Sequence, residues 1–284
     1  MKVDELMSSP VLAVRPTNPV AVARNMMLSR KVKHLAVLER GKVVGVISIS
    51  DIAAHIWREM QSRTLRPLES IPVSTLMSTE LVSVSVGTDV LKAVRVMVQR
   101  GVGSVLVTDA GDVTGIVTET DVLRALVRSG GLNMKIGEIM KREFVSVGRR
   151  NSLSQALKRI ITAGEKGAVV LEGERPVGII TGVDIAFASI EGVKEKKMTK
   201  FTRKIERAGR PMARHVREVF SAEVEDLMRP DLVTVSEEES AVVAAELIMK
   251  RGLTMLPVVR GDTLAGVITK SEILKALAGQ ERSL

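Results

Sequence analysis

The chain is organised around Gly45-Val46-Ile47-Ser48-Ile49-Ser50-Asp51, which is a glycine followed by a short apolar run, a hydroxyl residue and an acid. The same pattern returns as Gly115-Ile116-Val117-Thr118-Glu119-Thr120-Asp121, as Gly178-Ile179-Ile180-Thr181-Gly182-Val183-Asp184 and as Gly266-Val267-Ile268-Thr269-Lys270-Ser271-Glu272. In each copy the acid stands six residues after the glycine. A pattern that recurs in this way indicates an internal repeat.

A second landmark, a leucine or isoleucine followed by methionine, precedes each copy. The pairs are Leu6-Met7, Leu76-Met77, Ile139-Met140 and Leu227-Met228. Met7 and Asp51 are 44 residues apart, and the other three copies have the same separation. The methionines themselves are 70, 63 and 88 residues apart, so insertions lie between units and not within them. The chain is therefore a fourfold repeat.

The first unit reads as strand, helix, strand, strand, helix. We expect a strand at 11–14, a helix at 20–28, a hairpin of strands at 35–38 and 43–49, and a helix opened by Ser48 and Asp51. The corresponding helices before the hairpin are expected at 90–98, 153–161 and 241–249, the hairpin strands at 105–107 with 113–118, 168–171 with 177–181 and 256–259 with 264–269, and the later helices from Asp121, Asp184 and Glu272. The predicted fold class is α/β (α+β).

One unit of about 55 residues buries too little surface to be stable alone, so we expect the units to share cores in pairs. The short connection at 128–135, which contains Gly130-Gly131, is the expected boundary between the pairs. The predicted domains are a first pair at 1–130, with repeats at 3–57 and 73–127, and a second pair at 131–284, with repeats at 136–190 and 224–278. A basic insertion at 191–223 would then lie inside the second pair.

Composition excludes several classes of protein. The chain has no cysteine, so disulfides, thiolate catalysis and cysteine-zinc sites are excluded. Its three histidines are not at metal-ligand spacing. No apolar run approaches the ~20 residues needed to span a bilayer, and the first residues do not resemble a signal peptide. We expect a soluble cytoplasmic protein, and the lack of cysteine with abundant charge fits a thermophilic source.

The repeats resemble cystathionine-beta-synthase (CBS) domains, which occur as tandem pairs called Bateman modules. The resemblance rests on the Leu-Met start, on the strand Leu256-Pro257-Val258-Val259 and on the Gly-apolar-Thr-x-x-Asp run, and it covers the chain apart from the links. Four such units without a catalytic domain look most like the nucleotide-sensing gamma subunit of AMP-activated protein kinase and its archaeal relatives. The resemblance implies an adenine-nucleotide ligand (AMP, ADP or ATP), with S-adenosylmethionine as the alternative.

In the family, the aspartate of this run holds the ribose hydroxyls of the nucleotide, and the preceding Ser or Thr contacts the ribose or phosphate. Carried over by position, the candidates are Ser48 with Asp51, Thr118 with Asp121 and Thr181 with Asp184. A carboxylate accepts two hydrogen bonds, which suits a vicinal diol. The alternative is a capping box, in which the same two residues satisfy the first backbone N–H groups of a helix and bind nothing else.

The fourth copy differs because its acid is Glu272, preceded by Thr269. This pair suits a capping box at least as well as the others do. The side chain of glutamate is one methylene longer, however, and would displace the ribose contact. We therefore expect no ordinary ribose site in the fourth repeat, which leaves at most three.

The gamma-subunit pattern also places basic residues just before the first hairpin strand, where they face nucleotide phosphates. The matching positions are Lys33 and His34 in the first unit and Lys166 in the third. Phosphates need positive or N–H donors, so these three are the phosphate candidates. The alternative is that they form a solvated entry to the strand.

The basic insertion is the stretch least like the family. Residues 191–223 hold ten Lys/Arg and five Asp/Glu, so +5 of the net charge of +9 lies there. Met198, Phe201, Ile205 and Ala208 fall on one face of a predicted helix. The insertion could dock an acidic partner or a nucleic-acid backbone, or it could pack on its own pair with a charged outer face. Aromatic residues are only 2% of the chain, which disfavours stacking on single-stranded nucleic acid.

No catalytic constellation is present in the sequence. It lacks a GxxxxGK phosphate loop, a histidine-acid cluster and a nucleophile paired with a base. We predict a non-catalytic, energy-sensing regulatory protein without metal or catalytic cofactor, which signals in trans to a kinase-like or other regulated partner. The alternatives are an S-adenosylmethionine sensor and a nucleic-acid-binding protein. The two pairs would pack as a disc within one chain, or the chain would form a homodimer.

Overall fold

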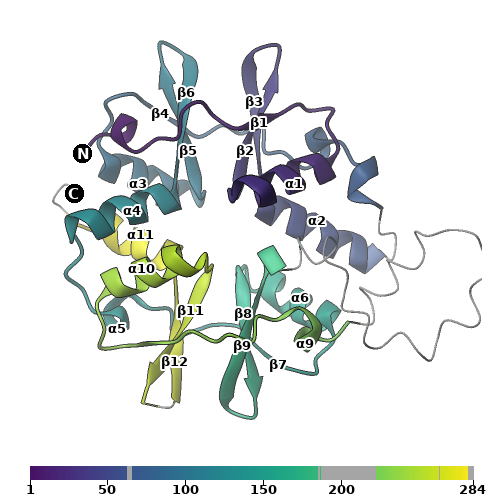
Figure 1. Cartoon of the computed structure of the whole chain (residues 1–284), viewed down its shortest axis with the longest axis vertical. Helices are drawn as coiled ribbons and strands as arrows, with labels where there is room; N and C mark the ends of the chain where they lie inside the picture. Colours follow the sequence, from purple (N-terminus) through teal and green to yellow (C-terminus); the bar gives the residue numbers. More distant parts are fainter. Residues whose placement is uncertain (63–65, 185, 187–221, 262, 281–284) are drawn as a thin grey trace, which may run out of the picture.

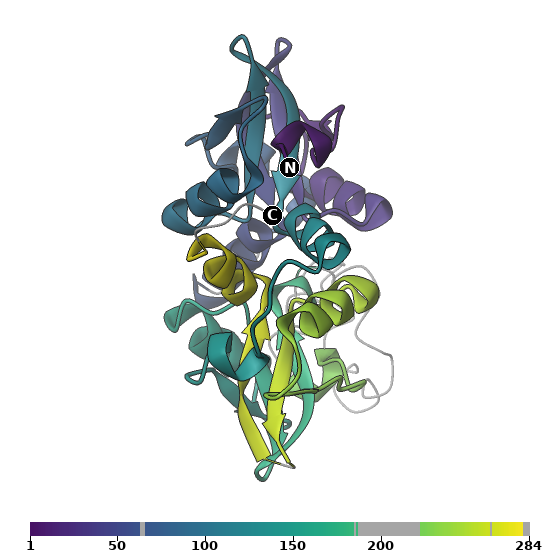
Figure 2. The ribbon, with the colours of Figure 1, turned by 90° about the vertical axis from the view of Figure 1, so that its left-hand side faces the viewer.

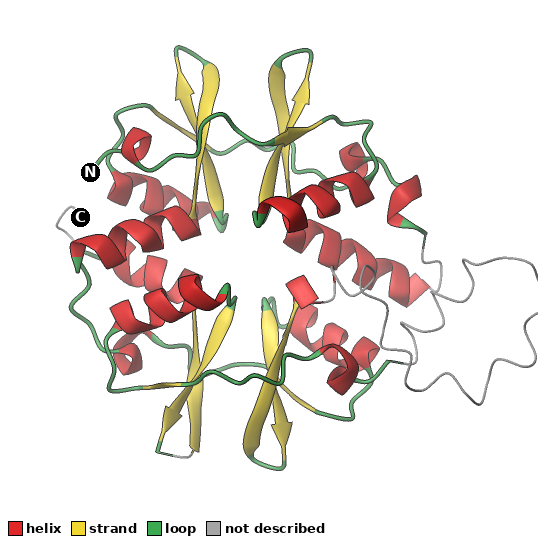
Figure 3. Cartoon of the chain, in the orientation of Figure 1, coloured by secondary structure: helices red, strands yellow, loops and turns green. Residues whose placement is uncertain are grey.

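Four small sheets surround a common centre in the computed structural model (Figure 1). The structure describes residues 1–62, 66–184, 186, 222–261 and 263–280. The mixed α/β fold of four repeats predicted from the sequence is confirmed (Figure 3). Almost all of the basic insertion at 191–223, including its predicted helix, lies outside the described residues. Within the described part of the chain, no helix has the length and apolar character needed to cross a membrane.

The four sheets share one topology, in which a short first strand pairs parallel with the second, and the second and third form an antiparallel hairpin. The strands are β1 (Ala13–Val14), β2 (His34–Glu39), β3 (Lys42–Ser48), β4 (Ser83–Ser85), β5 (Ser104–Asp109), β6 (Asp112–Thr118), β7 (Ser146–Gly148), β8 (Gly167–Glu172), β9 (Arg175–Thr181), β10 (Val235–Ser236), β11 (Met255–Arg260) and β12 (Thr263–Thr269). Each hairpin has one register shift, and it falls at the same place in every copy.

In the described part of the chain, a helix precedes each hairpin and another follows the hairpins of the first, second and fourth repeats, while residues 182–184 after β9 are also helical. The longer helices are α1 (Val20–Arg30), α2 (Ile49–Ser62), α3 (Val90–Arg100), α4 (Glu119–Ser129), α6 (Leu153–Thr162), α10 (Ala241–Arg251) and α11 (Lys270–Ala278). The short ones are the 3-10 helices η1 (Val3–Glu5), η2 (Leu68–Ser70) and η3 (Val73–Thr75) and the α-helices α5 (Ile136–Ile139) and α9 (Val224–Leu227). Helices α4 and α11 begin two residues before the expected Asp121 and Glu272, because Thr118 and Thr269 are the N-caps and the acids occupy the third helical position.

The recurring glycine and the recurring methionine pack against each other across a pair of repeats. The contacts join Gly45 to Met77, Gly115 to Met7, Gly178 to Met228 and Gly266 to Met140. A β-carbon on Gly178 would lie 2.7 Å from the carbonyl oxygen of Arg229, so no other residue fits there without movement. Each contact has a reciprocal partner, which places the first repeat beside the second and the third beside the fourth. The two landmarks of the sequence are therefore the two sides of one packing contact.

The two pairs meet through their helices, while the hairpins point away from the contact (Figure 2). Helices α3 and α4 of the second repeat pack on α11 and α10 of the fourth, and α2 of the first packs on α6 of the third. Two separate hydrophobic cores result. One contains the fully buried Leu126 and Leu277, and the other contains the buried Ile52 and Ile160. Each core thus combines residues from both pairs.

Candidate functional site at the centre of the repeats

The recurring acid caps its helix in all four repeats. The backbone N–H and the hydroxyl of the preceding Ser or Thr donate to one carboxylate oxygen of the acid. The N–H to carboxylate distances are 2.8 Å for Ser48 to Asp51, 2.9 Å for Thr118 to Asp121, 2.8 Å for Thr181 to Asp184 and 3.2 Å for Thr269 to Glu272. The cap uses one oxygen and leaves the second oxygen of each acid for another partner.

The second oxygens are not equivalent. Three of them face a basic side chain, which is Arg124 at 2.9 Å for Asp121, Arg229 at 2.6 Å for Asp184 and Lys275 at 3.5 Å for Glu272. In the described part of the chain, no donor is bonded to Oδ1 of Asp51. Asp51 is therefore the acid that is best prepared to accept hydrogen bonds from a ligand.

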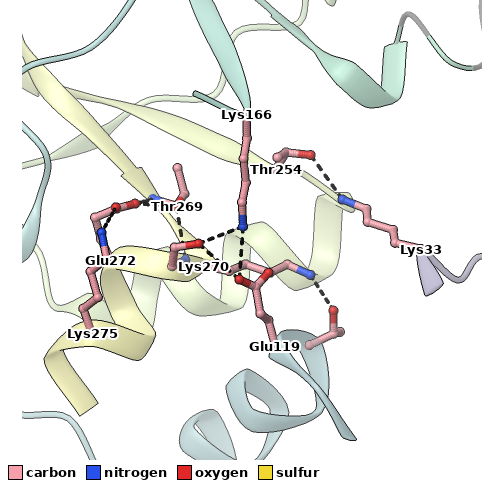
Figure 4. Close-up of polar contacts among 10 residues, drawn as sticks. Lys33, Glu119, Lys166, Thr254, Thr269, Lys270, Glu272 and Lys275 are labelled. Atoms are coloured by element: carbon pink, nitrogen blue, oxygen red, sulfur yellow. Dashed lines mark hydrogen bonds and ion pairs between the residues drawn. The ribbon is translucent and has the colours of Figure 1, made fainter. Parts of the chain in front are cut away.

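Lysines from three repeats converge near the inner ends of the strands (Figure 4). Lys33 of the first repeat donates to Oγ1 of Thr254 at 3.1 Å. Lys166 of the third repeat donates to Glu119 at 3.1 Å, and Lys270 of the fourth donates to Thr120. Each of these contacts joins one pair of repeats to the other pair. We call Lys33, Lys166, Lys270 and Glu119 the central cluster.

The environment of Lys33 disfavours its positive charge. Burial, followed by the nearby positive charge of Lys270, lowers the pKa of Lys33 to about 8. Burial also lowers the pKa of Lys270 from its ordinary value. The central cluster itself holds three basic side chains and one acid, so Glu119 does not balance its positive charge. An anion at this position would relieve the repulsion among these basic side chains.

His34, the third phosphate candidate, lies next to the central cluster. A β-carbon on Gly103 would lie 3.2 Å from Nε2 of His34 and 3.6 Å from the carboxyl carbon of Glu119. Burial is the main cause that lowers the pKa of His34 to about 4. The imidazole is therefore neutral at pH 7, where it can offer an N–H group but no charge.

We expect His34 to make the fold sensitive to acid. Its folded pKa of about 4 lies below the ordinary 6.5, so between these values the unfolded chain binds a proton that the folded chain does not. The stability that depends on a neutral His34 is present above pH 6.5 and is lost as the pH falls towards 4, at a cost of up to about 3 kcal/mol. Urea unfolding of the wild type and of His34→Gln between pH 7 and pH 4 measures this. The variant should lose less stability, and equal losses in the two proteins would show that other groups cause the effect.

Several central residues were missed by sequence reasoning. Glu119, Lys270 and Ser271 open helices α4 and α11, and Thr254 and Arg229 reach the site from the fourth repeat. One signal was present in the four aligned runs. The residue after the hydroxyl is Ile49, Glu119, Gly182 and Lys270 in turn, so equivalent positions carry opposite charges. The contacts between these residues arise only when the repeats assemble.

Two surface hollows lie away from the central cluster. One, of about 720 Å³, is lined by residues of α6 and by Phe144, Val145, Asn151 and Ala163, and the other, of about 680 Å³, lies between the segment 13–18 and the β2–β3 turn. Neither includes any residue of the central cluster. Among the described residues, no group of three or more acidic or histidine side chains is placed to hold a metal ion.

One protein-family model matches the chain, and it matches four times. The family model described as "CBS domain" matches residues 3–58, 73–128, 136–191 and 224–279. These four segments cover most of the sequence. They fall on the four sheets and their helices.

Relatives and solved structures with similar length are also found. The chain is 25% identical over 281 residues to the uncharacterized protein MJ1225 of Methanocaldococcus jannaschii, covering 94% of this chain and 95% of the relative. The crystal structure of MJ1225, described there as a proposed archaeal homologue of γ-AMPK, superposes with a TM-score of 0.79 at 23% identity, covering 97% of this chain and 99% of MJ1225. An uncharacterized conserved protein from Pyrococcus horikoshii gives a TM-score of 0.65 at 20% identity, covering 98% of this chain and all of that one.

Proposed function

This chain belongs to the CBS domain family, with four copies of the domain, and from that premise we propose that it is a non-catalytic regulatory protein that binds adenine nucleotides between paired repeats. The phosphates would lie at the central cluster. The ribose would lie at the acids that follow the hairpins.

The observation that carries the proposal is the excess of positive charge at the centre. Lys33, Lys166 and Lys270 come from three repeats and meet around a single acid of the central cluster, Glu119. Holding three cations this close together lowers the stability of the free protein, and a bound anion would offset that cost. A phosphate chain supplies the missing negative charge and several strong acceptors. The charge therefore favours AMP, ADP or ATP over S-adenosylmethionine, which carries no phosphate.

The partners of the recurring acids suggest the order in which the ribose sites fill. Asp51 has an open second oxygen within the described part of the chain, whereas Asp121 and Asp184 already bind Arg124 and Arg229. A ribose that displaces an arginine loses the energy of an existing ion pair. We therefore expect the site beside Asp51 to fill first, and the site of Glu272 not to bind ribose.

Regulation would follow from the position of the centre between the two pairs. The lysine contacts that a phosphate would replace all join one pair to the other. A ligand that binds one arrangement of the pairs more tightly shifts the population towards that arrangement. A partner protein that recognises the favoured arrangement would then receive the signal.

Thermal unfolding with AMP, ADP, ATP, adenosine and S-adenosylmethionine added separately tests the proposal. A ligand at 100 times its dissociation constant stabilises the folded state by about 2.7 kcal/mol per site, which raises the Tm by several degrees. We expect the three nucleotides to raise the Tm more than adenosine or S-adenosylmethionine does. If no adenosine compound raises the Tm, or if S-adenosylmethionine gives the largest shift, the proposed function is wrong.

A further inference from the structure

Glu119 is a carboxylate that lies among cations from the opposite pair of repeats (Figure 4). Its Oε1 accepts hydrogen bonds from Nζ of Lys166 and from Oγ of Ser271, both at 3.1 Å. The Glu119 side chain is 15% exposed. Lys166 belongs to the third repeat and Ser271 to the fourth, while Glu119 belongs to the second. Oε1 of Glu119 thus accepts hydrogen bonds from the two donors that would otherwise be available to a phosphate oxygen.

The negative charge of Glu119 also acts on Lys33 and His34, the two phosphate candidates of the first repeat. The groups whose charges act on Lys33 are Lys270, Glu119, Arg229 and Lys166. Those that act on His34 are Glu119, Lys166, Lys270 and Lys33. Glu119 is the acid in both sets. Its charge therefore reduces the positive potential that an incoming anion meets at the centre.

The cap of helix α4 does not require Glu119. Thr118 and Asp121 already form the capping box there. Equivalent positions in the other repeats are Ile49, Gly182 and Lys270, which shows that the fold accepts neutral and basic residues at this place. The capping of α4 therefore does not explain why the acid faces Lys166.

We propose that Glu119 is a specificity-determining residue that acts as an internal competitor for the phosphate site. In the free protein its carboxylate holds Lys166. In the bound protein the same carboxylate repels the phosphate chain, and the repulsion grows with the number of phosphate charges. The residue thereby lowers the preference for triphosphates over monophosphates. This inference rests on the proposed function, because it concerns the same site.

Glu119→Gln tests the inference, since glutamine keeps the length of the side chain and an oxygen that accepts hydrogen bonds. Calorimetric titration with AMP, ATP, pyrophosphate and inorganic tripolyphosphate gives the dissociation constants. We expect the variant to bind ATP and tripolyphosphate about tenfold more tightly and AMP only about two- to threefold more tightly. Glu80→Gln is the matched control. It removes the same charge from a side chain that is 77% exposed and pairs with Arg100, and it should leave all four constants unchanged.

Three results would overturn the inference. Glu119→Gln binds the polyanions more weakly, or all four ligands change by the same factor, or the variant behaves as Glu80→Gln does. The inorganic ligands separate this inference from the proposed function. If tripolyphosphate binds with the expected gain while no adenosine compound binds, the centre is a polyanion site controlled by Glu119 and the adenine-nucleotide function fails. If no anion binds either the wild type or the variant, both are wrong.

Discussion

Asp51→Asn is expected to weaken adenine-nucleotide binding at the first-filled site by about 100-fold, because two hydrogen bonds to a charged group together contribute about 3 kcal/mol. Asparagine keeps an oxygen that can accept from the N–H and the hydroxyl of Ser48, so the cap of α2 persists. The Tm of the free protein should therefore change little. Asparagine is preferred to alanine because it weakens the ligand contact and keeps the helix cap, whereas alanine would remove both. Calorimetric titration with AMP and unfolding of the free protein give the two quantities.

Asp184→Asn is the matched control for this prediction. The second oxygen of Asp184 is bound to Nε of Arg229 at 2.6 Å, so a ribose has to displace that arginine and this site should not be the first to fill. We expect its effect on the first binding event to be less than about threefold. If Asp51→Asn leaves the affinity unchanged while the protein still binds AMP, the recurring acids are helix caps and the ligand is held elsewhere.

Lys33→Met is expected to stabilise the free protein and to weaken its affinity for ATP. The folded pKa of Lys33 is about 8, below the ordinary 10.5, so its charge opposes folding at pH 7 by up to about 3 kcal/mol. This cost is fully present below pH 8 and disappears as the pH rises towards 10.5, because the folded chain then loses the proton first. The lost contact to phosphate should weaken ATP binding by about 10- to 100-fold and adenosine binding little.

Urea unfolding of the wild type and of Lys33→Met between pH 7 and pH 10.5 measures the stability part. The difference in unfolding free energy should shrink steadily over this range. Lys250→Met is the control, since it removes an exposed lysine of α10 and should change neither stability nor affinity appreciably. If Lys33→Met is less stable than the wild type at pH 7, or if it binds ATP equally well, Lys33 is a structural lysine and not a phosphate ligand.

The elements of each repeat were predictable because their causes lie within 50 residues of sequence. The hairpin and the helix of the first repeat, for example, follow from the apolar run at Gly45–Ile49 and the cap residues Ser48 and Asp51. The recurring glycine and methionine also marked the four copies correctly. What the sequence did not reveal was that these two landmarks touch each other across a pair, since nothing local records which repeat faces which.

The candidate site was predictable only in its local part. The pairing of each hydroxyl with its acid is a contact between residues three apart, and it is present in all four repeats. The contacts of the central cluster join residues that are 47 to 221 positions apart, as for Lys166 with Glu119 and Lys33 with Thr254. Such contacts depend on how four similar units assemble. The repeat pattern shows what the units have in common, but the contacts come from positions at which the units differ. The roles of Lys33, His34 and Lys166 towards phosphate stay predictions.

The two shared cores have a consequence for how the chain unfolds. Neither pair of repeats can open its half of a core without exposing the half that belongs to the other pair. Within the described part of the chain, local openings that cost less than complete unfolding should therefore be confined to the hairpin turns, while amide hydrogens in α4 and α11 exchange only when both pairs open together. A nucleotide bound beside Asp51 in the first repeat would then slow exchange in the third repeat, because these two repeats share one core and open together.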